Sequence, residues 1–324
     1  MAIWESSPYG INNYPDVFEL YKLHQKNHWV AEEIQYSMDI MDWNTKLTDS
    51  EKEYLTYNFR FFTQADIDVA NGYIEHFLPY YKNIYVRMAL LNYASMEATH
   101  IESYAKIIIS LNMPETEFTK FLEYKEMFDK HTYFDNFNMD TPLNVALTTG
   151  LYGAFAEGLQ LFASFIMLLN FQRFNKMRAM CQVVAYSIRD EQIHVDSMIA
   201  IYHHFIRERI EMSDFGSVEL DYLRAEFEKI ARKVVELEDC FIDNAFKNFE
   251  IEGLTAEEVK SFIRYIANMR LKQLGFNPIY SNSEAKPLVW VTIILEALTS
   301  TNFFENRVTE YASNGVSNWD KIDY

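Results

Sequence analysis

The chain has 324 residues, a formal net charge of −18 at pH 7, and only 9 glycines and 7 prolines. Glycine averages roughly 7% and proline roughly 5% of protein residues, so this chain is poor in helix breakers and long helices are expected. The strong negative charge argues against a nucleic-acid-binding face, because phosphate binding needs a clustered Lys/Arg surface and the sequence contains no such cluster.

Apolar periodicity divides the chain into successive helices, with no linker rich in glycine, serine or proline between them. Thr48 with Glu51, and Thr255 with Glu258, have the spacing of capping boxes and mark two helix starts. The stretch 131–140 is interpreted as a loop, and no hairpin signal predicts a sheet. The first helix is expected to start at Pro15 and to continue through Trp29 and Glu33, which would then lie one turn apart. Further helices are expected over residues 48–77, 84–111, 117–128, 142–171, 175–209, 218–246 and 256–274. One or two short helices are expected after residue 287.

Residues 150–171 are almost entirely apolar and long enough to cross a bilayer. Their single charge, Glu157, would be costly in lipid, and no Lys/Arg cluster flanks the segment. We therefore expect a helix buried inside a bundle and no membrane association. The N-terminus lacks the features of a signal peptide, and Cys181 and Cys240 form no paired motif, so a reducing, cytoplasmic location is expected.

Two Glu-x-x-His pairs indicate a metal site. Glu97 with His100, and Glu191 with His194, each place a carboxylate and an imidazole on one helix face, because residues three apart are neighbours there. Tyr104 lies one turn after His100 on the same face. Chance alone could almost supply two such pairs. Whether they form a metal site therefore depends on the residues around them.

Each pair is preceded by an acid on a long apolar helix. Asp66 lies 31 positions before Glu97 (97 − 66), and Glu157 lies 34 positions before Glu191 (191 − 157). This spacing fits one helix, a turn and part of an antiparallel neighbour. Asp68 is the alternative to Asp66, but Phe62 and Val69 share the face of Asp66, which favours Asp66 as the inward residue.

Four carboxylates and two imidazoles are the ligand set of a dinuclear carboxylate site. Ionised carboxylates on faces this apolar are costly to bury unless they are paired or bind metal. Ferritin-like bundles take single acids from two helices and Glu-x-x-His from two others. We therefore expect an all-α, ferritin-like helical bundle with additional helices around a dinuclear metal site, and oxygen and nitrogen ligands that suit iron or manganese.

The sequence also resembles the small, radical-generating β subunit of class I ribonucleotide reductase, from about Trp29 to Tyr324. The likeness rests on F-F-T-Q-A-D at 61–66, M-E-A-T-H-I-E-S-Y at 96–104, F-A-E-G-L at 155–159 and S-I-R-D-E-Q-I-H at 187–194. It implies that one metal is held by Asp66, Glu97 and His100 and the other by Glu157, Glu191 and His194, with Glu97 and Glu191 bridging.

The resemblance further implies roles in radical chemistry. The dinuclear site, activated by oxygen or a related oxidant, would generate a radical that is stored on Tyr104 or on the metals. Trp29 and Asp190 match a tryptophan and an aspartate linked to the metal-bound His100, and Tyr311 matches the tyrosine that relays the radical to the large subunit. The small subunit would be active in ribonucleoside-diphosphate reduction only with that large catalytic subunit.

The implied cofactor is Fe/Fe first, with Mn/Mn and Mn/Fe as alternatives. The implied partners are a second copy in a homodimer, the large α subunit and an activating flavoprotein. The expected domains are a single helical domain at 1–308 and a flexible tail at 309–324 that docks on the large subunit. The alternatives are a ferritin-like dimetal oxidase or oxygenase for a small apolar substrate, and a metal-storage protein. The oxidase would not need Tyr104, Trp29 and the tail together, and storage proteins are usually shorter single bundles without the extra helices expected here.

Overall fold

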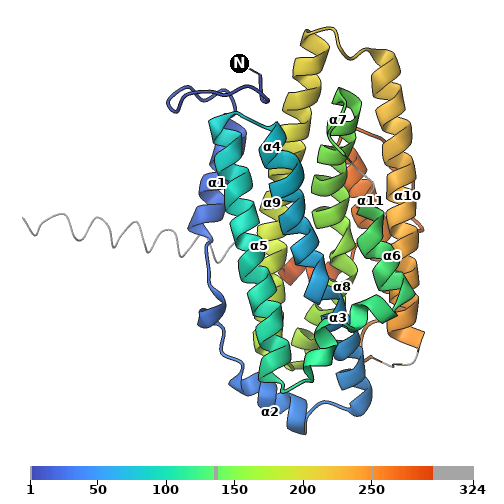
Figure 1. Ribbon diagram of the computed structural model, residues 1–324. Helices are drawn as coiled ribbons and strands as arrows, with labels where there is room; N and C mark the ends of the chain where they lie inside the picture. Colours follow the sequence, from blue (N-terminus) through green and yellow to red (C-terminus); the bar gives the residue numbers. More distant parts are fainter. Residues whose placement is uncertain (1, 135–137, 248, 250, 295–324) are drawn as a thin grey trace, which may run out of the picture. The chain divides into compact units, whose positions relative to one another are not determined.

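The structure, a computed structural model, describes residues 2–134, 138–247, 249 and 251–294 (Figure 1). The chain divides into two compact units, Met1–Pro287 and Leu288–Tyr324. No strand occurs in the described part of the chain, which confirms the all-α expectation. The predicted boundary between residues 308 and 309 lies outside the described residues and stays a prediction.

The first unit is built from α-helices and from short 3-10 or π-helical segments, labelled η. In the second unit, the described residues 289–294 are helical. In chain order the elements of the first unit are α1 (Pro15–Lys26), η1 (Ala31–Glu33), α2 (Ser37–Thr45), α3 (Asp49–Gly72), η2 (Tyr73–Phe77), α4 (Leu78–Tyr80), α5 (Ile84–Ser110), η3 (Glu115–Phe118), η4 (Lys120–Glu123), α6 (Lys125–Tyr133), α7 (Pro142–Leu151), η6 (Tyr152–Gln160), α8 (Phe162–Leu169), η7 (Asn170–Phe174), α9 (Arg178–Glu211), α10 (Ser217–Lys247) and α11 (Ala256–Gln273).

Four elements form a closed ring in the first unit. Helix α3 packs against α5, α5 against α9, α9 against the π-helical η6, and η6 against α3. Helix α1 packs against α5 and α9, whereas α10 and α11 contact η6 from its other side (Figure 1). Gly153 lets η6 approach α9 closely, because a Cβ there would lie 2.5 Å from the Cβ of Met198. The interior of this ring is where the predicted ligands can meet.

The first helix is shorter than expected. Helix α1 ends at Lys26, and Trp29 precedes an extended Val30, so the prediction that Trp29 and Glu33 lie one turn apart on a helix is wrong. The reason is a tertiary hydrogen bond: Arg189 donates to the Asn27 carbonyl oxygen at 2.6 Å, an oxygen that a continuing helix would need for its own ladder.

Other helix predictions hold with local changes. Both predicted capping boxes are present, at Thr48/Glu51 and Thr255/Glu258. The helix expected over 48–77 is α3 followed by the π-helical η2. The helix expected over 117–128 is two 3-10 turns and α6, which continues to Tyr133, so the expected loop at 131–140 begins later than predicted.

The apolar stretch Pro142–Phe174 is long and apolar enough to cross a membrane by length and composition. Its most apolar 18-residue window is entirely buried inside the protein, as expected for a core helix. It is not a uniform α-helix, because the π-helical η6 separates α7 from α8. Glu157 lies within this π-helical segment.

Candidate metal centre

All four elements of the ring contribute acidic or histidine side chains to its interior. Each of these side chains is at most 1% exposed. They are Asp66 from α3, Glu97 and His100 from α5, Glu157 from η6, and Glu191 and His194 from α9. The six residues predicted from the two halves of the sequence therefore meet in one buried cluster.

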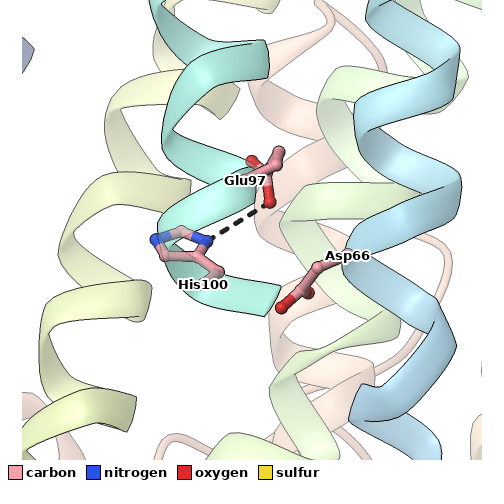
Figure 2. A group of neighbouring side chains, drawn as sticks. All are labelled: Asp66, Glu97 and His100. Atoms are coloured by element: carbon pink, nitrogen blue, oxygen red, sulfur yellow. Dashed lines mark hydrogen bonds and ion pairs between the residues drawn. The ribbon is translucent and has the colours of Figure 1, made fainter. Parts of the chain in front are cut away.

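One side of the cluster combines Asp66, Glu97 and His100 (Figure 2). One ligand atom from each of the three lies within 4.8 Å of the others. The Nδ1 atom of His100 is 3.2 Å from Oε2 of Glu97. These three side chains, from α3 and α5, could hold one metal ion.

The other side combines Glu97, Glu157 and His194, whose ligand atoms again lie within 4.8 Å of one another. Nδ1 of His194 is 3.1 Å from Oε1 of Glu97 and 3.9 Å from Oε2 of Glu157. A second ion could lie here, with Glu97 shared between the two sides.

Glu97 and Glu191 each face both imidazoles. The two oxygens of Glu97 point to different histidines, as described above, and those of Glu191 do the same. Oε1 of Glu191 is 3.2 Å from Nδ1 of His100, and its Oε2 is 3.3 Å from Nδ1 of His194. A carboxylate with one oxygen on each side has the arrangement that a bridging ligand needs.

Several polar atoms of this cluster have no hydrogen-bond partner among the described residues, although they are fully buried. These atoms are Oδ2 of Asp66, Oε1 of Glu97, Oε2 of Glu157, both carboxylate oxygens of Glu191 and Nδ1 of His194. The close contacts between carboxylates and His194 thus lack hydrogen-bond geometry. Unpaired buried polar atoms are costly, and coordination of two cations would satisfy this set. The residues present fit a dinuclear metal centre.

The electrostatics of the cluster show what a metal would replace. Burial works against a charged imidazole at His194, but Glu191 and Glu97 outweigh it and raise the pKa of His194 to about 10. The pKa of His100 is also raised, by Glu97 against the effect of burial. Burial raises the pKa values of Asp66 and Glu157 well above the usual range. Without metal the cluster therefore holds protons in the place of cations.

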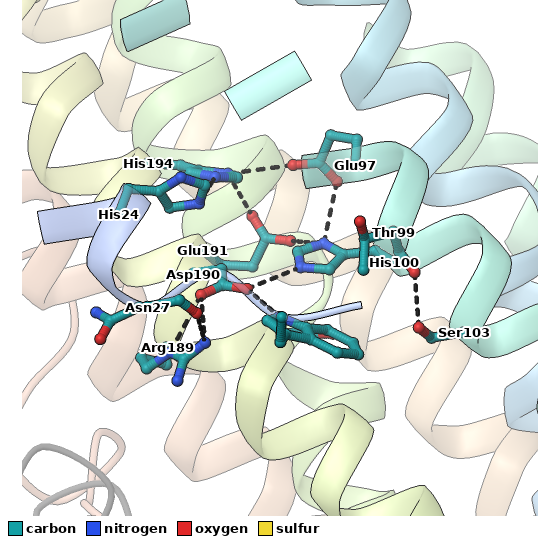
Figure 3. A network of polar contacts seen from close by, with 12 residues as sticks. His24, Asn27, Glu97, Thr99, His100, Ser103, Arg189, Asp190, Glu191 and His194 are labelled. Atoms are coloured by element: carbon teal, nitrogen blue, oxygen red, sulfur yellow. Dashed lines mark hydrogen bonds and ion pairs between the residues drawn. The ribbon is translucent and has the colours of Figure 1, made fainter. Parts of the chain in front are cut away.

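A hydrogen-bonded chain leads from His100 through Asp190 to Trp29. Figure 3 shows His100 and Asp190 with the neighbouring Arg189. Nε2 of His100 lies 3.3 Å from Oδ2 of Asp190, and the Trp29 indole N–H donates to the same oxygen at 2.7 Å. Arg189 also donates to Asp190, at 3.1 Å. Burial opposes ionisation of Asp190, but His100 and Arg189 keep its pKa below the usual range. An ionised carboxylate thus orients His100 and leaves Nδ1 facing the cluster.

The second histidine has a neutral partner instead. Nε2 of His194 lies 3.1 Å from Nε2 of His24, whose Nδ1 is 2.8 Å from Oδ1 of Asn92. Burial and then His194 lower the pKa of His24 to about 4, so this imidazole is uncharged near neutral pH. The His24 N–H donates to Asn92, which leaves Nε2 of His24 to accept from His194. The two imidazoles of the cluster are therefore oriented by different partners, His100 by an ionised carboxylate and His194 by an uncharged imidazole.

Tyr104 is enclosed by aromatic rings beside the cluster. Its ring stacks on Phe62 with centroids 4.2 Å apart and an interplanar angle of 8°, and Phe62 stacks in turn on Phe165. Its hydroxyl donates to Oγ of Ser187 at 3.2 Å. Burial and then Asp66 raise the pKa of Tyr104 well above the usual range, so the phenol keeps its proton.

Some neighbours were not predicted. His24 has no acid at metal-ligand spacing, so no sequence signal placed it next to His194. Tyr73, on η2, lies beside Glu157, and burial and then that carboxylate raise its pKa. Asp68, the alternative to Asp66, forms an ion pair with His131 away from the cluster. Tyr311 lies outside the described residues.

Residues 11–287 match the family model described as "Ribonucleotide reductase, small chain". The chain belongs to the ribonucleotide reductase small-chain family. The match ends at the last residue of the first compact unit. This confirms the expectation that the chain is a ribonucleoside-diphosphate reductase small subunit, in preference to the oxidase and the storage protein. Small chains of class I use a dinuclear metal centre and work with a large catalytic subunit.

Individual relatives agree with this family. The chain is 42% identical over 321 residues to a probable ribonucleoside-diphosphate reductase small subunit of Invertebrate iridescent virus 3, covering 94% of this chain and 84% of the relative. An R2 subunit from Clostridium botulinum has the same fold, with a TM-score of 0.80, 22% identity and coverage of 89% and 90%. The dimanganese(II)-NrdF of Streptococcus sanguinis follows, with a TM-score of 0.73, 20% identity and coverage of 88% and 97%. The ferritin-like fold expected for a small chain is confirmed.

Proposed function

We propose that this small chain holds two metal ions with the six buried side chains Asp66, Glu97, His100, Glu157, Glu191 and His194. The observation that supports this most strongly is that Glu97 and Glu191 each direct one oxygen to Nδ1 of each histidine. Both would bridge, with Asp66 and His100 completing one metal position and Glu157 and His194 the other.

The ligand types favour iron or manganese. Carboxylate oxygens and imidazole nitrogens suit both, and no thiolate lies in the cluster to favour zinc. We propose Fe/Fe, with Mn/Mn and Mn/Fe as the alternatives that the same ligands allow. When bound and activated by oxygen or a related oxidant, the metals supply the one-electron oxidising capacity of the small chain.

Tyr104 is proposed to hold the radical. Loss of one electron and the hydroxyl proton from Tyr104 would leave a neutral phenoxyl, and the stacked Phe62 excludes water from one face of its ring. The hydrogen bond to Ser187 fixes the direction of the hydroxyl group. A buried, apolar setting of this kind slows quenching of a radical by solvent.

Asp190 and Trp29 are proposed to carry the oxidising equivalent away from the centre. The indole N–H of Trp29 is hydrogen-bonded to Asp190, so a proton can shift along this bond when the ring is oxidised. Tyr311 and the tail 309–324 would continue the route to the large catalytic subunit, which binds the ribonucleotide. A homodimer, an activating flavoprotein and a cytoplasmic location complete the proposal.

The test is metal analysis combined with electron paramagnetic resonance of the oxidised protein. We expect two iron or manganese ions per chain and a tyrosyl signal, together with ribonucleotide reduction when the large subunit is added. A chain that binds fewer than two ions with all six side chains intact would contradict the proposed centre. A chain that binds two ions but gives no reductase activity with any large subunit would contradict the proposed route.

A further inference from the structure

The π-helical segment η6 presents Glu157 to the cluster and is followed by the α-helix α8. In a π-helix each N–H bonds the carbonyl five residues back, and in an α-helix four residues back. Where the pattern changes from π to α, one carbonyl oxygen is passed over by the ladder. A buried carbonyl oxygen that the ladder leaves out needs a donor from elsewhere.

Arg270 of α11 supplies a donor at this junction. It is fully buried at 0% exposure, and its Nε donates to the carbonyl oxygen of Gly158 at 2.9 Å. Gly158 directly follows Glu157. The glycine leaves room for the guanidinium, because a Cβ at position 158 would lie 2.7 Å from Nε of Arg270 and 3.0 Å from the Gly153 carbonyl oxygen.

The same guanidinium also reaches the helix that carries the second Glu/His pair. Its Nη2 donates to Oε1 of Gln192 at 3.2 Å, and Gln192 directly follows Glu191. No ion pair to Arg270 occurs among the described residues; Gln192 instead donates to Asp196 at 2.7 Å and so links the two charges indirectly. Burial lowers the pKa of Arg270 to about 10, which still leaves it charged near neutral pH.

Lys130 of α6 binds the end of the same segment. Its Nζ donates to the carbonyl oxygen of Gln160 at 3.0 Å, and the Gln160 side-chain amide donates back to the Lys130 carbonyl oxygen at 3.3 Å. Lys130 is 1% exposed and pairs with the buried Glu238 at 2.7 Å. Two buried cations thus hold backbone carbonyls within four residues of Glu157.

We propose that Arg270 is a positioning residue for Glu157, and that Lys130 assists it by anchoring the end of η6. Two of the three hydrogen bonds that the Arg270 side chain donates, to Gly158 and to Gln192, tie the segment of Glu157 to the helix of Glu191 and His194. The inference rests on the proposed role of Glu157 as a metal ligand. It assigns to α11, which contributes no ligand, control over one of the two metal positions.

The experiment loads metal-free protein with Mn(II) alone. Wild type, Arg270→Gln and Arg270→Lys are compared with Arg264→Gln as the matched control, because Arg264 lies on the same helix but pairs with Asp239. Bound manganese is counted by titration, and electron paramagnetic resonance distinguishes a coupled pair of ions from a single one. Circular dichroism reports folding of the metal-free variants.

We expect wild type and Arg264→Gln to bind two Mn(II) ions as a coupled pair. Arg270→Gln should lose at least about tenfold affinity for one ion and show the signal of a single manganese, as for residues that orient metal ligands. Arg270→Lys keeps the charge but only one donor group, so it should also weaken one ion while remaining folded.

Arg270 variants that bind both ions as tightly as wild type would overturn the inference, whatever their thermal stability. If Arg270→Gln does not fold, Arg270→Lys decides the question by the same measurement. Failure of wild type itself to bind two Mn(II) ions would instead overturn the proposed metal centre, so the two failures are distinguishable.

Discussion

The Trp29 indole and the Asp190 carboxylate are joined by a hydrogen bond of 2.7 Å that is buried from solvent. The same carboxylate oxygen lies 3.3 Å from Nε2 of His100. One oxygen atom of Asp190 therefore connects the oxidisable ring of Trp29 to an imidazole of the candidate ligand cluster.

Replacement of Trp29 by phenylalanine tests this connection. The variant keeps an aromatic ring but lacks the N–H donor and is harder to oxidise, so we expect a normal Tyr104 signal and reductase activity with the large subunit reduced to background. Trp43→Phe, on α2, which contributes no side chain to the cluster, serves as the control and should keep its activity. Full activity of Trp29→Phe would exclude Trp29 from the route.

Replacement of Tyr104 by phenylalanine should remove the tyrosyl signal and the activity while keeping both metals. The loss of one hydrogen bond to Ser187 should cost only about 0.5–1.5 kcal/mol of unfolding free energy. Tyr54→Phe is the matched control, since Tyr54 is equally buried but packs on Phe171 and Phe246. The assignment is wrong if wild type shows no tyrosyl signal and Tyr104→Phe retains full activity.

Metal binding should release protons and strengthen with rising pH. The raised pKa values of His194, about 10, and of His100 mean that both imidazoles are protonated near pH 7 in the metal-free protein. A metal ion must displace those protons, so the apparent affinity should rise about tenfold per pH unit for each proton displaced, up to the pKa of His194. Calorimetry in buffers of different ionisation enthalpy counts the protons; an affinity independent of pH between 6 and 8 would contradict this.

Lys130→Met should strongly destabilise the metal-free protein, by about 3–5 kcal/mol, because it leaves Glu238 buried without its partner. Burial raises the pKa of Glu238 to about 7 even with Lys130 present. A carboxyl group with a raised folded-state pKa contributes stability at low pH that is lost as the pH rises, so the destabilisation should be larger at pH 8 than at pH 6. Urea unfolding measures it, and the double variant Lys130→Met/Glu238→Met should recover much of the loss.

Deletion of the last residues from Trp319 should abolish activity with the large subunit while leaving the metal content and the Tyr104 signal unchanged. These residues lie outside the described part of the chain, so the prediction rests on the family resemblance of the tail. The binding of truncated and complete chains to the large subunit is compared directly. Unchanged binding after truncation would remove the docking role from the tail.

The sequence predicted the parts of this molecule that depend on local patterns. The capping boxes at Thr48 and Thr255 and the face shared by Glu97 and His100 follow from spacing along single helices, and the structure contains them. The choice of Asp66 over Asp68 followed from the neighbours of Asp66 on one helix face. Helical period alone was enough for these features.

Features that depend on contacts between distant segments were missed. Helix α1 ends at Lys26 because Arg189, far away in sequence, binds the carbonyl of Asn27. The contact between His24 and His194 joins α1 to α9, and no sequence motif links these two residues. The π-helical geometry around Glu157 is matched by donors from α6 and α11, whose buried Lys130 and Arg270 look like ordinary surface residues in a sequence.

The unequal partners of the two histidines would make the two proposed metal positions chemically different. His100 is hydrogen-bonded to a carboxylate and His194 to an uncharged ring, so the two proposed ligand sets, otherwise similar, would donate electron density to their ions to different degrees. To make the two positions equivalent, the residue to replace first would be His24 and not one of the proposed ligands. In the natural chain, two different metal ions bound together would each prefer one of the two positions.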